Sequence, residues 1–468
     1  MRAELIADVV AEFKAYGRIV IVGASLAGLR AAETLRDEGF TGPLTIIGDE
    51  KQEPYDRPPL SKQVLKGLAR ADHTLLPRMR KVDADWRLGV AATGLDRRVK
   101  QVRLADGEQV PFDRLLIATG TRSRPWFNPQ EAALEGVFTL RTADDAGRLR
   151  AALAAGPGRV LIVGAGFIGS EMASVCRELG LAVTVAERAE GPLVGALGGV
   201  IGDIAAEMQR DHGVDLRTGV SVEALEGDAQ GHVRRARLSD GTTLDVDVVV
   251  ASLGSIRNTE WLEGAGLASG RWGVACDAGC RVFDINGVVT DSIFVAGDIA
   301  RAPHVLYDYQ FLVQEHWDNA DVGGRVAAHN MVSLEPQRRP HLPLPAFWSG
   351  QFGVNIKGVG VGPFADEIVI TQGSVTDRRF AAAYGRNGRI VAAVTFNHGK
   401  WLEYYGALIE RSAPFPPPPP GYDHPDGMQP MPARFPTPGA PTGWPDVVLT
   451  GHDPTERGAE YEYRTKKR

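Results

Sequence analysis

The stretch that decides the fold is Arg159-Val-Leu-Ile-Val-Gly-Ala-Gly-Phe-Ile-Gly-Ser170. Its apolar run at 160–163 is too short for a helix and ends at a glycine, which predicts a buried parallel strand. The glycine-rich turn leads into a predicted helix over about 168–179, and residues 182–186 predict a second strand. This strand, helix, strand unit predicts an α/β fold with a parallel sheet.

The same pattern occurs about 140 residues earlier in the chain. Residues 18–22 predict a strand, residues 26–38 a helix and residues 44–47 another strand. The turn after the first strand reads Gly23-Ala-Ser-Leu-Ala-Gly28. The chain therefore contains two nucleotide-sized α/β units.

Both turns have the spacing of a dinucleotide-binding fingerprint. Small residues at these positions let backbone N–H groups and the positive end of the helix approach a pyrophosphate. Gly164, Gly166 and Gly169 complete the pattern in the second unit. The first unit has Ser25 in place of the second glycine, and a serine crowds this approach only slightly. We expect each unit to bind a dinucleotide.

An acidic residue follows each fingerprint at the end of the next strand. Glu50 follows Gly28 by 22 residues, and Glu187 follows Gly169 by 18. A carboxylate there accepts hydrogen bonds from ribose hydroxyls and repels a 2′-phosphate, so we expect NADH at the second site, with NADPH less favoured. The neighbouring Arg188 argues the other way, because a 2′-phosphate would bind it.

Length, charge and cysteine content limit the function classes. The chain has 468 residues, enough for about three domains, and its net charge of −6 gives no positive field for nucleic acid. Three cysteines are too few for a disulfide framework and form no paired metal-ligand motif, so we expect a cytoplasmic protein without a metal site. No apolar run is long enough for a membrane span, and no signal peptide is expected.

The remaining segments have their own patterns. Residues 1–17 predict an amphipathic helix that packs on the body of the protein; the alternative is a helix for a partner or a membrane. Alternating residues after Pro336, with a tight turn at Asn387-Gly388, predict an antiparallel sheet. Fourteen of the 30 prolines lie between Pro414 and Pro454, which predicts an extended, disordered tail over 413–468; the alternative is a Pro-rich recognition motif.

Four further motifs, together with the two fingerprints, resemble the FAD-dependent ferredoxin reductases of the putidaredoxin and rhodocoxin reductase type. They are Glu50-Lys-Gln-Glu-Pro-Tyr-Asp-Arg-Pro-Pro-Leu-Ser-Lys62, Leu116-Ile-Ala-Thr-Gly120, Phe294-Val-Ala-Gly-Asp298 and Glu315-His-Trp-Asp-Asn-Ala320. The resemblance implies a glutathione-reductase-like flavoprotein fold with two Rossmann-like domains. Its expected parts are an FAD-binding domain (18–125 and 255–335), an inserted NAD-binding domain (126–254) and a C-terminal α+β interface domain (336–412).

The resemblance also implies roles for single residues. The FAD-binding residues implied are Gly23, Ser25 and Gly28 at the pyrophosphate, Glu50 at the adenosine ribose, Arg57, Lys62, Thr119 and Gly120 near the flavin, and Asp298 at the ribityl chain. Those implied for NADH are Gly164, Gly166, Gly169 and Glu187, with Glu171 near the nicotinamide; Gly254 is also expected to bind a cofactor.

Lys62, Glu171 and Trp317 are the residues expected at the reacting centre. A cation at Lys62 would stabilise the negative charge of the reduced flavin. Trp317 would stack beside the isoalloxazine and exclude water. The structural alternatives are a solvated lysine, a helix-face glutamate without a role and a core tryptophan.

The absence of cysteine from residues 23–75 separates this chain from disulfide reductases, which carry a cysteine pair there. The resemblance therefore implies hydride transfer from NADH to FAD, followed by single-electron transfer to a [2Fe–2S] ferredoxin. That ferredoxin would feed a cytochrome P450 or a ring-hydroxylating oxygenase. Thiol chemistry is not expected, and Cys276 and Cys280 are interpreted as incidental.

Two other functions stay open. One is a flavin NADH dehydrogenase with a small-molecule acceptor (quinone, radical or oxygen), and the other is a redox-gated binding flavoprotein resembling apoptosis-inducing factor. Docking of an acidic ferredoxin would need local basic charge. The candidates are Arg70, Arg78, Arg80, Lys81, Arg338 and Arg339, and the alternative is a solvated charged face.

Overall fold

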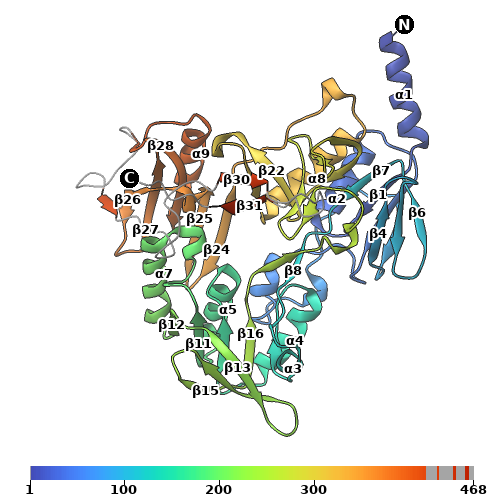
Figure 1. Ribbon diagram of the computed structural model, residues 1–468. Helices are drawn as coiled ribbons and strands as arrows, with labels where there is room; N and C mark the ends of the chain where they lie inside the picture. Colours follow the sequence, from blue (N-terminus) through green and yellow to red (C-terminus); the bar gives the residue numbers. More distant parts are fainter. Residues whose placement is uncertain (1, 418–428, 432–445, 450–458, 463–468) are drawn as a thin grey trace.

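Three main β-sheets organise the chain, and helices cover their faces (Figure 1). The computed structural model describes residues 2–417, 429–431, 446–449 and 459–462. Two of the sheets are mainly or wholly parallel and the third is antiparallel, so the α/β class predicted from the two units is confirmed.

The first sheet combines the first unit with a much later segment. Its strands, in order, are β20 (Arg281–Phe283), β21 (Val289–Val295), β7 (Arg114–Ile117), β1 (Ile19–Val22), β2 (Leu44–Gly48) and β3 (Asp85–Leu88). β1 is buried along its whole length and pairs in parallel with β2 and β7. α2 (Leu26–Asp37) joins β1 to β2 and packs against α8 (Trp317–Met331).

The second sheet is parallel throughout and is built around the second unit. Its strands, in order, are β12 (Asp215–Thr218), β11 (Val183–Glu187), β10 (Val160–Val163), β16 (Val248–Ala251) and β9 (Val137–Phe138). The helices of this part of the chain are α3 (Pro129–Ala132), α4 (Ala143–Ala154), α5 (Phe167–Glu178), α6 (Val194–Leu197) and α7 (Gly199–Asp211). Its central strands β10 and β16 are apolar and buried along their whole length, which is why each appears in the sequence as a continuous hydrophobic run.

The third sheet is antiparallel and follows α8 in the chain. Its strands, in order, are β24 (Ala346–Gln351), β25 (Val354–Gly360), β28 (Arg389–Phe396), β27 (Arg379–Arg386), β26 (Glu367–Ser374) and β29 (Gln429–Met431), and α9 (Leu402–Glu410) packs against β25 and β28. Asn387 (φ 50°) and Gly388 (φ 71°) form the predicted tight turn, since a type I′ turn needs positive φ at both positions.

Smaller sheets fill the edges of these layers. They are β4 (Ala92–Asp96), β5 (Gln101–Leu104) and β6 (Gln109–Pro111); β13 (Val222–Gly227), β14 (Val233–Leu238) and β15 (Thr243–Asp245); β8 (Thr121–Ser123) with β17 (Ser255–Arg257); β18 (Ser269–Gly270), β19 (Gly273–Ala275), β22 (Ala300–His304) and β23 (Gln310–Val313); and β30 (Asp446–Leu449) with β31 (Ala459–Glu462). The β8 and β17 pair is the place where the chain leaves and re-enters the first layer.

The N-terminal helix is present, but it projects from the body of the protein instead of packing along it, so that prediction is wrong. α1 (Arg2–Tyr16) projects from the body in Figure 1, and Val9 is 60% exposed. Contact is made near its C-terminal end, where the Phe13 ring lies 6.0 Å from that of Phe40 and the Arg114 guanidinium lies 4.0 Å from the Phe13 ring. The Lys14 ammonium also donates to the Glu38 carbonyl oxygen (2.6 Å), so the described contacts hold the helix at its C-terminal end.

Most of the proline-rich tail lies outside the described residues, so its expected disorder stays a prediction. Beyond residue 417 its described segments are the strands β29, β30 and β31, of which β29 pairs with β26 at the edge of the third sheet. Among the helices that the structure describes, none combines the length and the apolar character needed to cross a bilayer.

A buried ion-pair network and a close backbone approach join α2 to α8. Arg30 donates to Glu33 (2.8 Å) and to Asp321 (2.6 Å), and both Arg30 and Glu33 side chains are 3% exposed. A Cβ atom at Gly324 would lie 2.4 Å from the Ala27 carbonyl oxygen, so glycine is needed at this crossing. The helix of the first nucleotide-sized unit, α2, is thereby fixed to α8.

Gly324→Ala should therefore lower the free energy of unfolding by about 2 kcal/mol, because the two helices must move apart. Gly147→Ala is the matched control, since Gly147 also lies in a helix but nothing occupies the space around its Cβ position. That change should raise stability by about 0.5–1 kcal/mol through helix propensity. Urea unfolding followed by tryptophan fluorescence measures both, and equal effects would contradict the close-approach argument.

Candidate functional site

The turn of the second unit has the backbone geometry that its glycines predict. Gly164 has a φ of +100°, and a Cβ at Gly169 would lie 2.0 Å from the Gly164 carbonyl oxygen. No atom lies within 4 Å of a Cβ position at Gly166. The first glycine therefore makes the turn, the third lets the helix pack closely, and the second leaves the backbone open to a ligand.

The first unit repeats this geometry with one substitution. Gly23 has a φ of +125°, and a Cβ at Gly28 would lie 1.9 Å from the Gly23 carbonyl oxygen. Ser25 is the residue before α2 and has an ordinary extended φ of −119°. Because no left-handed conformation is required there, a serine replaces the glycine without strain. Both turns thus fit a pyrophosphate at a helix N-terminus.

The two acidic residues have different environments. The Glu187 carboxylate accepts hydrogen bonds from the backbone N–H groups of Ala165 (2.6 Å) and Ala189 (2.7 Å), so it lies beside the second fingerprint turn. Arg188 is exposed. Glu187 is thus anchored by the backbone at the end of β11.

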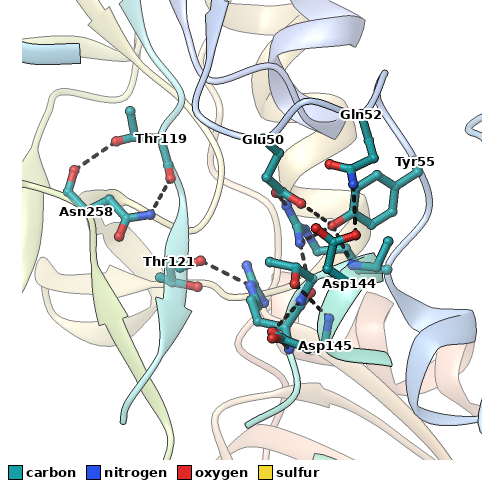
Figure 2. Close-up of polar contacts among 12 residues, drawn as sticks. Glu50, Gln52, Tyr55, Thr119, Thr121, Asp144, Asp145 and Asn258 are labelled. Carbon is teal, nitrogen blue, oxygen red and sulfur yellow. Dashed lines mark hydrogen bonds and ion pairs between the residues drawn. The ribbon is translucent and has the colours of Figure 1, made fainter. Parts of the chain in front are cut away.

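Glu50 is held by two side chains of the loop that follows β2 (Figure 2). Its carboxylate pairs with Arg57 (2.5 Å) and accepts a hydrogen bond from the Tyr55 hydroxyl (2.5 Å). Arg57 also donates to the Arg141 carbonyl oxygen (2.8 Å), and the Tyr55 oxygen accepts from the Ala143 N–H (3.1 Å). This loop therefore connects the end of β2 to the start of α4.

Thr119 lies where the chain crosses between the first two layers. Its hydroxyl donates to the Asn258 carbonyl oxygen (2.9 Å), and the Asn258 amide donates to the Thr119 carbonyl oxygen (2.8 Å), as Figure 2 shows. Gly120 (φ +58°) and Gly254 (φ +84°) flank the crossing strands, and no atom lies near their Cβ positions. The reciprocal bonds hold the two crossing strands at a fixed spacing.

Asp298 follows β21 and forms an ion pair with Arg141 (2.9 Å). Arg141 also donates to the Thr121 carbonyl oxygen (3.0 Å; Thr121 is labelled in Figure 2). The Asp298 side chain is 18% exposed, so a partner arginine limits the cost of its burial.

Lys62 and Glu171 form the central ion pair of the site. Lys62 Nζ lies 2.6 Å from Glu171 Oε2, and the Glu171 side chain is only 3% exposed. The Ser61 hydroxyl donates to the same oxygen (2.6 Å), and the Ser349 hydroxyl donates to Oε1 (2.7 Å). Residues from the first unit, from α5 and from β24 thus meet at one buried carboxylate.

Trp317 begins α8 and reaches the same region from the other side. Its indole N–H donates to Asp56 Oδ1 (2.9 Å). Partial burial raises the pKa of Asp56, while the Trp317 hydrogen bond and the charge of Lys62 lower it by less. Asp56, Lys62 and Trp317 therefore form one electrostatic group.

The structure brings together predicted residues that no local pattern connects. Lys62 and Glu171 are direct neighbours, and Trp317 joins them through Asp56. Sequence reasoning did not select Tyr55, Asp56, Ser61, Arg141, Asn258 or Ser349. Three of these residues, Tyr55, Asp56 and Ser61, lie inside the 50–62 motif, which is the signal that could have identified them. The other three lie outside every motif found in the sequence.

All three cysteines of the chain are buried free thiols. Burial raises the pKa of Cys176 and of Cys280 to about 12, and it raises that of Cys276 well above its usual range. Reactivity needs the thiolate, which is scarce at neutral pH in such surroundings. The interpretation of Cys276 and Cys280 as incidental stays a prediction.

Part of the expected basic face is neutralised by neighbouring acids. The pairs are Arg70 with Asp72, Arg78 with Glu53, and Arg80 with Asp37. These exposed pairs resemble a solvated charged face more than an unpaired basic patch, which was the alternative interpretation.

Replacing Lys62 with methionine should lower the free energy of unfolding by about 2 kcal/mol, because the buried Glu171 carboxylate loses its cation and keeps only the Ser61 and Ser349 hydroxyl donors. The double variant Lys62→Met with Glu171→Gln should recover about half of this loss. Lys66→Met is the control, since Lys66 pairs with Glu178, whose side chain is 48% exposed, and should cost less than about 1 kcal/mol. Urea unfolding measures all three; equal losses for Lys62→Met and Lys66→Met would count against a buried pair.

Two protein-family models match most of the chain. Residues 17–324 match the pyridine nucleotide-disulphide oxidoreductase family, and residues 346–419 match the reductase C-terminal family. A probable ferredoxin reductase, CtmF, from Castellaniella defragrans is 36% identical, over 81% of this chain and 90% of that protein. The ferredoxin--NAD(+) reductase component of the anthranilate 1,2-dioxygenase system of Burkholderia cepacia is 33% identical, over 84% of this chain and 94% of that protein.

A solved structure shares the architecture. The covalent complex of putidaredoxin reductase and putidaredoxin superposes with a TM-score of 0.78 at 29% identity, covering 86% of this chain and 94% of that one. The chain therefore belongs to the pyridine nucleotide-disulphide oxidoreductase family of FAD- and NAD(P)H-dependent flavoenzymes, among its ferredoxin reductases.

Proposed function

We propose that this enzyme oxidises NADH at a bound FAD and passes the electrons singly to a [2Fe–2S] ferredoxin that serves an oxygenase. The observation that carries the proposal is the Lys62–Glu171 pair, which lies where the two fingerprint units and Trp317 converge in a chain with no reactive thiol. The Burkholderia relative is named as a ferredoxin--NAD(+) reductase and the solved neighbour is joined to putidaredoxin, which supports the same partner class.

The first unit is proposed to bind FAD. Gly23, Ser25 and Gly28 would contact the pyrophosphate, and Glu50 would accept from the adenosine ribose. Arg57, Thr119, Gly120 and Asp298 would line the flavin and its ribityl chain. Arg57 and Arg141 already hold Glu50 and Asp298 in place, so these carboxylates are oriented before a ligand binds.

The second unit is proposed to bind NADH. Gly164, Gly166 and Gly169 would contact its pyrophosphate, Glu187 would accept from the adenosine ribose, and Gly254 would border the site. The anchoring of Glu187 by two backbone N–H groups keeps its charge near the fingerprint turn, which disfavours a 2′-phosphate.

FAD, when bound, would supply the capacity to accept the two electrons of a hydride and to release them one at a time. Lys62 would hold positive charge beside the reacting ring and so stabilise the negative charge that develops there. Glu171 fixes the position of Lys62 Nζ, and Trp317 would exclude water from the site while Asp56 orients its indole. Positioning and electrostatics carry the reaction, with no general acid or base required.

A cytochrome P450 or a ring-hydroxylating oxygenase would receive the electrons from the ferredoxin. The cytoplasm is the proposed location, in keeping with three unpaired thiols.

The test is NADH-driven cytochrome c reduction by the purified flavoprotein, with and without a [2Fe–2S] ferredoxin. Because cytochrome c accepts single electrons, a ferredoxin that relays them should raise the rate by at least about tenfold. Reduction of ferricyanide or a quinone with no response to several ferredoxins would favour a small-molecule acceptor. Slow turnover with a long-lived reduced complex would favour a redox-gated binding protein.

Glu187→Ala should raise the Michaelis constant for NADH by about tenfold and lower the preference for NADH over NADPH. The variant would lose the proposed hydrogen bonds between the Glu187 carboxylate and the ribose hydroxyls, and with them the negative charge that repels a 2′-phosphate. Arg188→Ala is the control and should leave the Michaelis constant for NADH within about twofold, since its side chain is exposed. Steady-state kinetics with both nucleotides measures the ratio. An unchanged ratio in Glu187→Ala would rule out this assignment.

A further inference from the structure

β24 lies along one face of α5, and three contacts set their relative position. The Phe347 ring lies 5.0 Å from that of Phe167, and the Ser349 hydroxyl donates to Glu171. Just beyond the strand, the Phe352 N–H donates to the Ser174 hydroxyl oxygen (2.7 Å). Positions 167, 171 and 174 share one face of the helix, while 347 and 349 share one face of the strand.

The neighbours of Ser349 direct its hydroxyl proton toward Glu171. Its side chain is buried, as are those of Glu171 and Gln351. The Gln351 amide donates to the Ser349 oxygen (3.1 Å), and the single hydroxyl proton of Ser349 goes to Glu171 Oε1. A buried carboxylate needs such donors, because each lone pair without one carries a desolvation cost.

The two oxygens of Glu171 therefore have separate partners. Oε2 accepts from Lys62 and Ser61, which belong to the first unit, and Oε1 accepts from Ser349 in the third sheet. A carboxylate bound on one oxygen alone can rotate about its terminal torsion, which is broad. Ser349 is the contact that opposes this rotation.

We infer that Ser349 is a positioning residue for the reacting centre: its hydroxyl fixes the rotation of the Glu171 carboxylate, so that Oε2 stays on Lys62 and the lysine cation keeps its place. The inference deepens the proposed function and rests on it for the role of Lys62. The third sheet thereby acts on hydride transfer from NADH through Glu171 and Lys62.

The test compares Ser349→Ala with Ser174→Ala in the purified flavoprotein. Ser174 is the matched control, because it is a buried serine in the same interface that does not contact Glu171. The first readout is acetylation of Lys62 by an amine-selective reagent, quantified by peptide mass spectrometry with the exposed Lys81 as the internal reference. Ser349→Ala should increase labelling of Lys62 several-fold relative to Lys81, and Ser174→Ala should leave the ratio unchanged.

The second readout is stopped-flow reduction of the bound FAD by NADH. Loss of one hydrogen bond to a buried charge should lower the limiting rate of Ser349→Ala by about tenfold. The NADH concentration that gives half the limiting rate should change by less than about twofold, since the Ser349 side chain is buried and its hydroxyl is bonded to Glu171. Ser349→Thr, which keeps the hydroxyl, should restore most of the rate.

Three outcomes would overturn the inference: unchanged Lys62 labelling in Ser349→Ala, an equal increase in Ser174→Ala, or equal rates in the isosteric pair Ser349→Thr and Ser349→Val. The isosteric pair serves if the alanine variant does not fold, because the two side chains differ only in the hydroxyl. Failure of NADH to reduce the wild-type flavin would instead reject the proposed function. The labelling experiment does not depend on NADH, so it would still test whether Ser349 holds Lys62 in place.

Discussion

The buried carboxylate of Glu171 is the constraint on which the rest of the site depends. It lies in α5 and accepts hydrogen bonds from Ser61 and Lys62 on one oxygen and from Ser349 on the other. A charge buried this deeply is stable only when each contact is made, so the three layers of the molecule must close on it together. The positions of Lys62 and Glu171 therefore depend on how the three layers pack against one another.

Two features let the layers close in this way. The first sheet is completed by β21, which pairs with β7 only after the chain has passed through the second layer. The crossing strands β8 and β17 pair with each other, and Thr119 and Asn258 bond reciprocally beside them. The second unit is thus held at both ends by the first, and α5 can present Glu171 at a fixed place.

Chemistry by charge and position suits this arrangement. The three cysteines are buried free thiols, and burial raises the pKa of each. The groups that lie together are instead Lys62, Asp56 and Trp317, which combine a cation, a carboxylate and an aromatic ring. In the proposed function, these groups would stabilise charge on the bound cofactor and exclude water from it.

The sequence by itself determined the local features. The paired units, the strands at 19–22 and 160–163, the fingerprint turns and the Asn387-Gly388 turn are each encoded within a few residues, because periodicity and backbone conformation are local properties. Tertiary structure decided the partners. Glu171 meets Ser349 across 178 positions, and α1 extends from the body despite its apolar pattern. Contacts at such separations depend on how whole layers pack, and no local pattern carries that information.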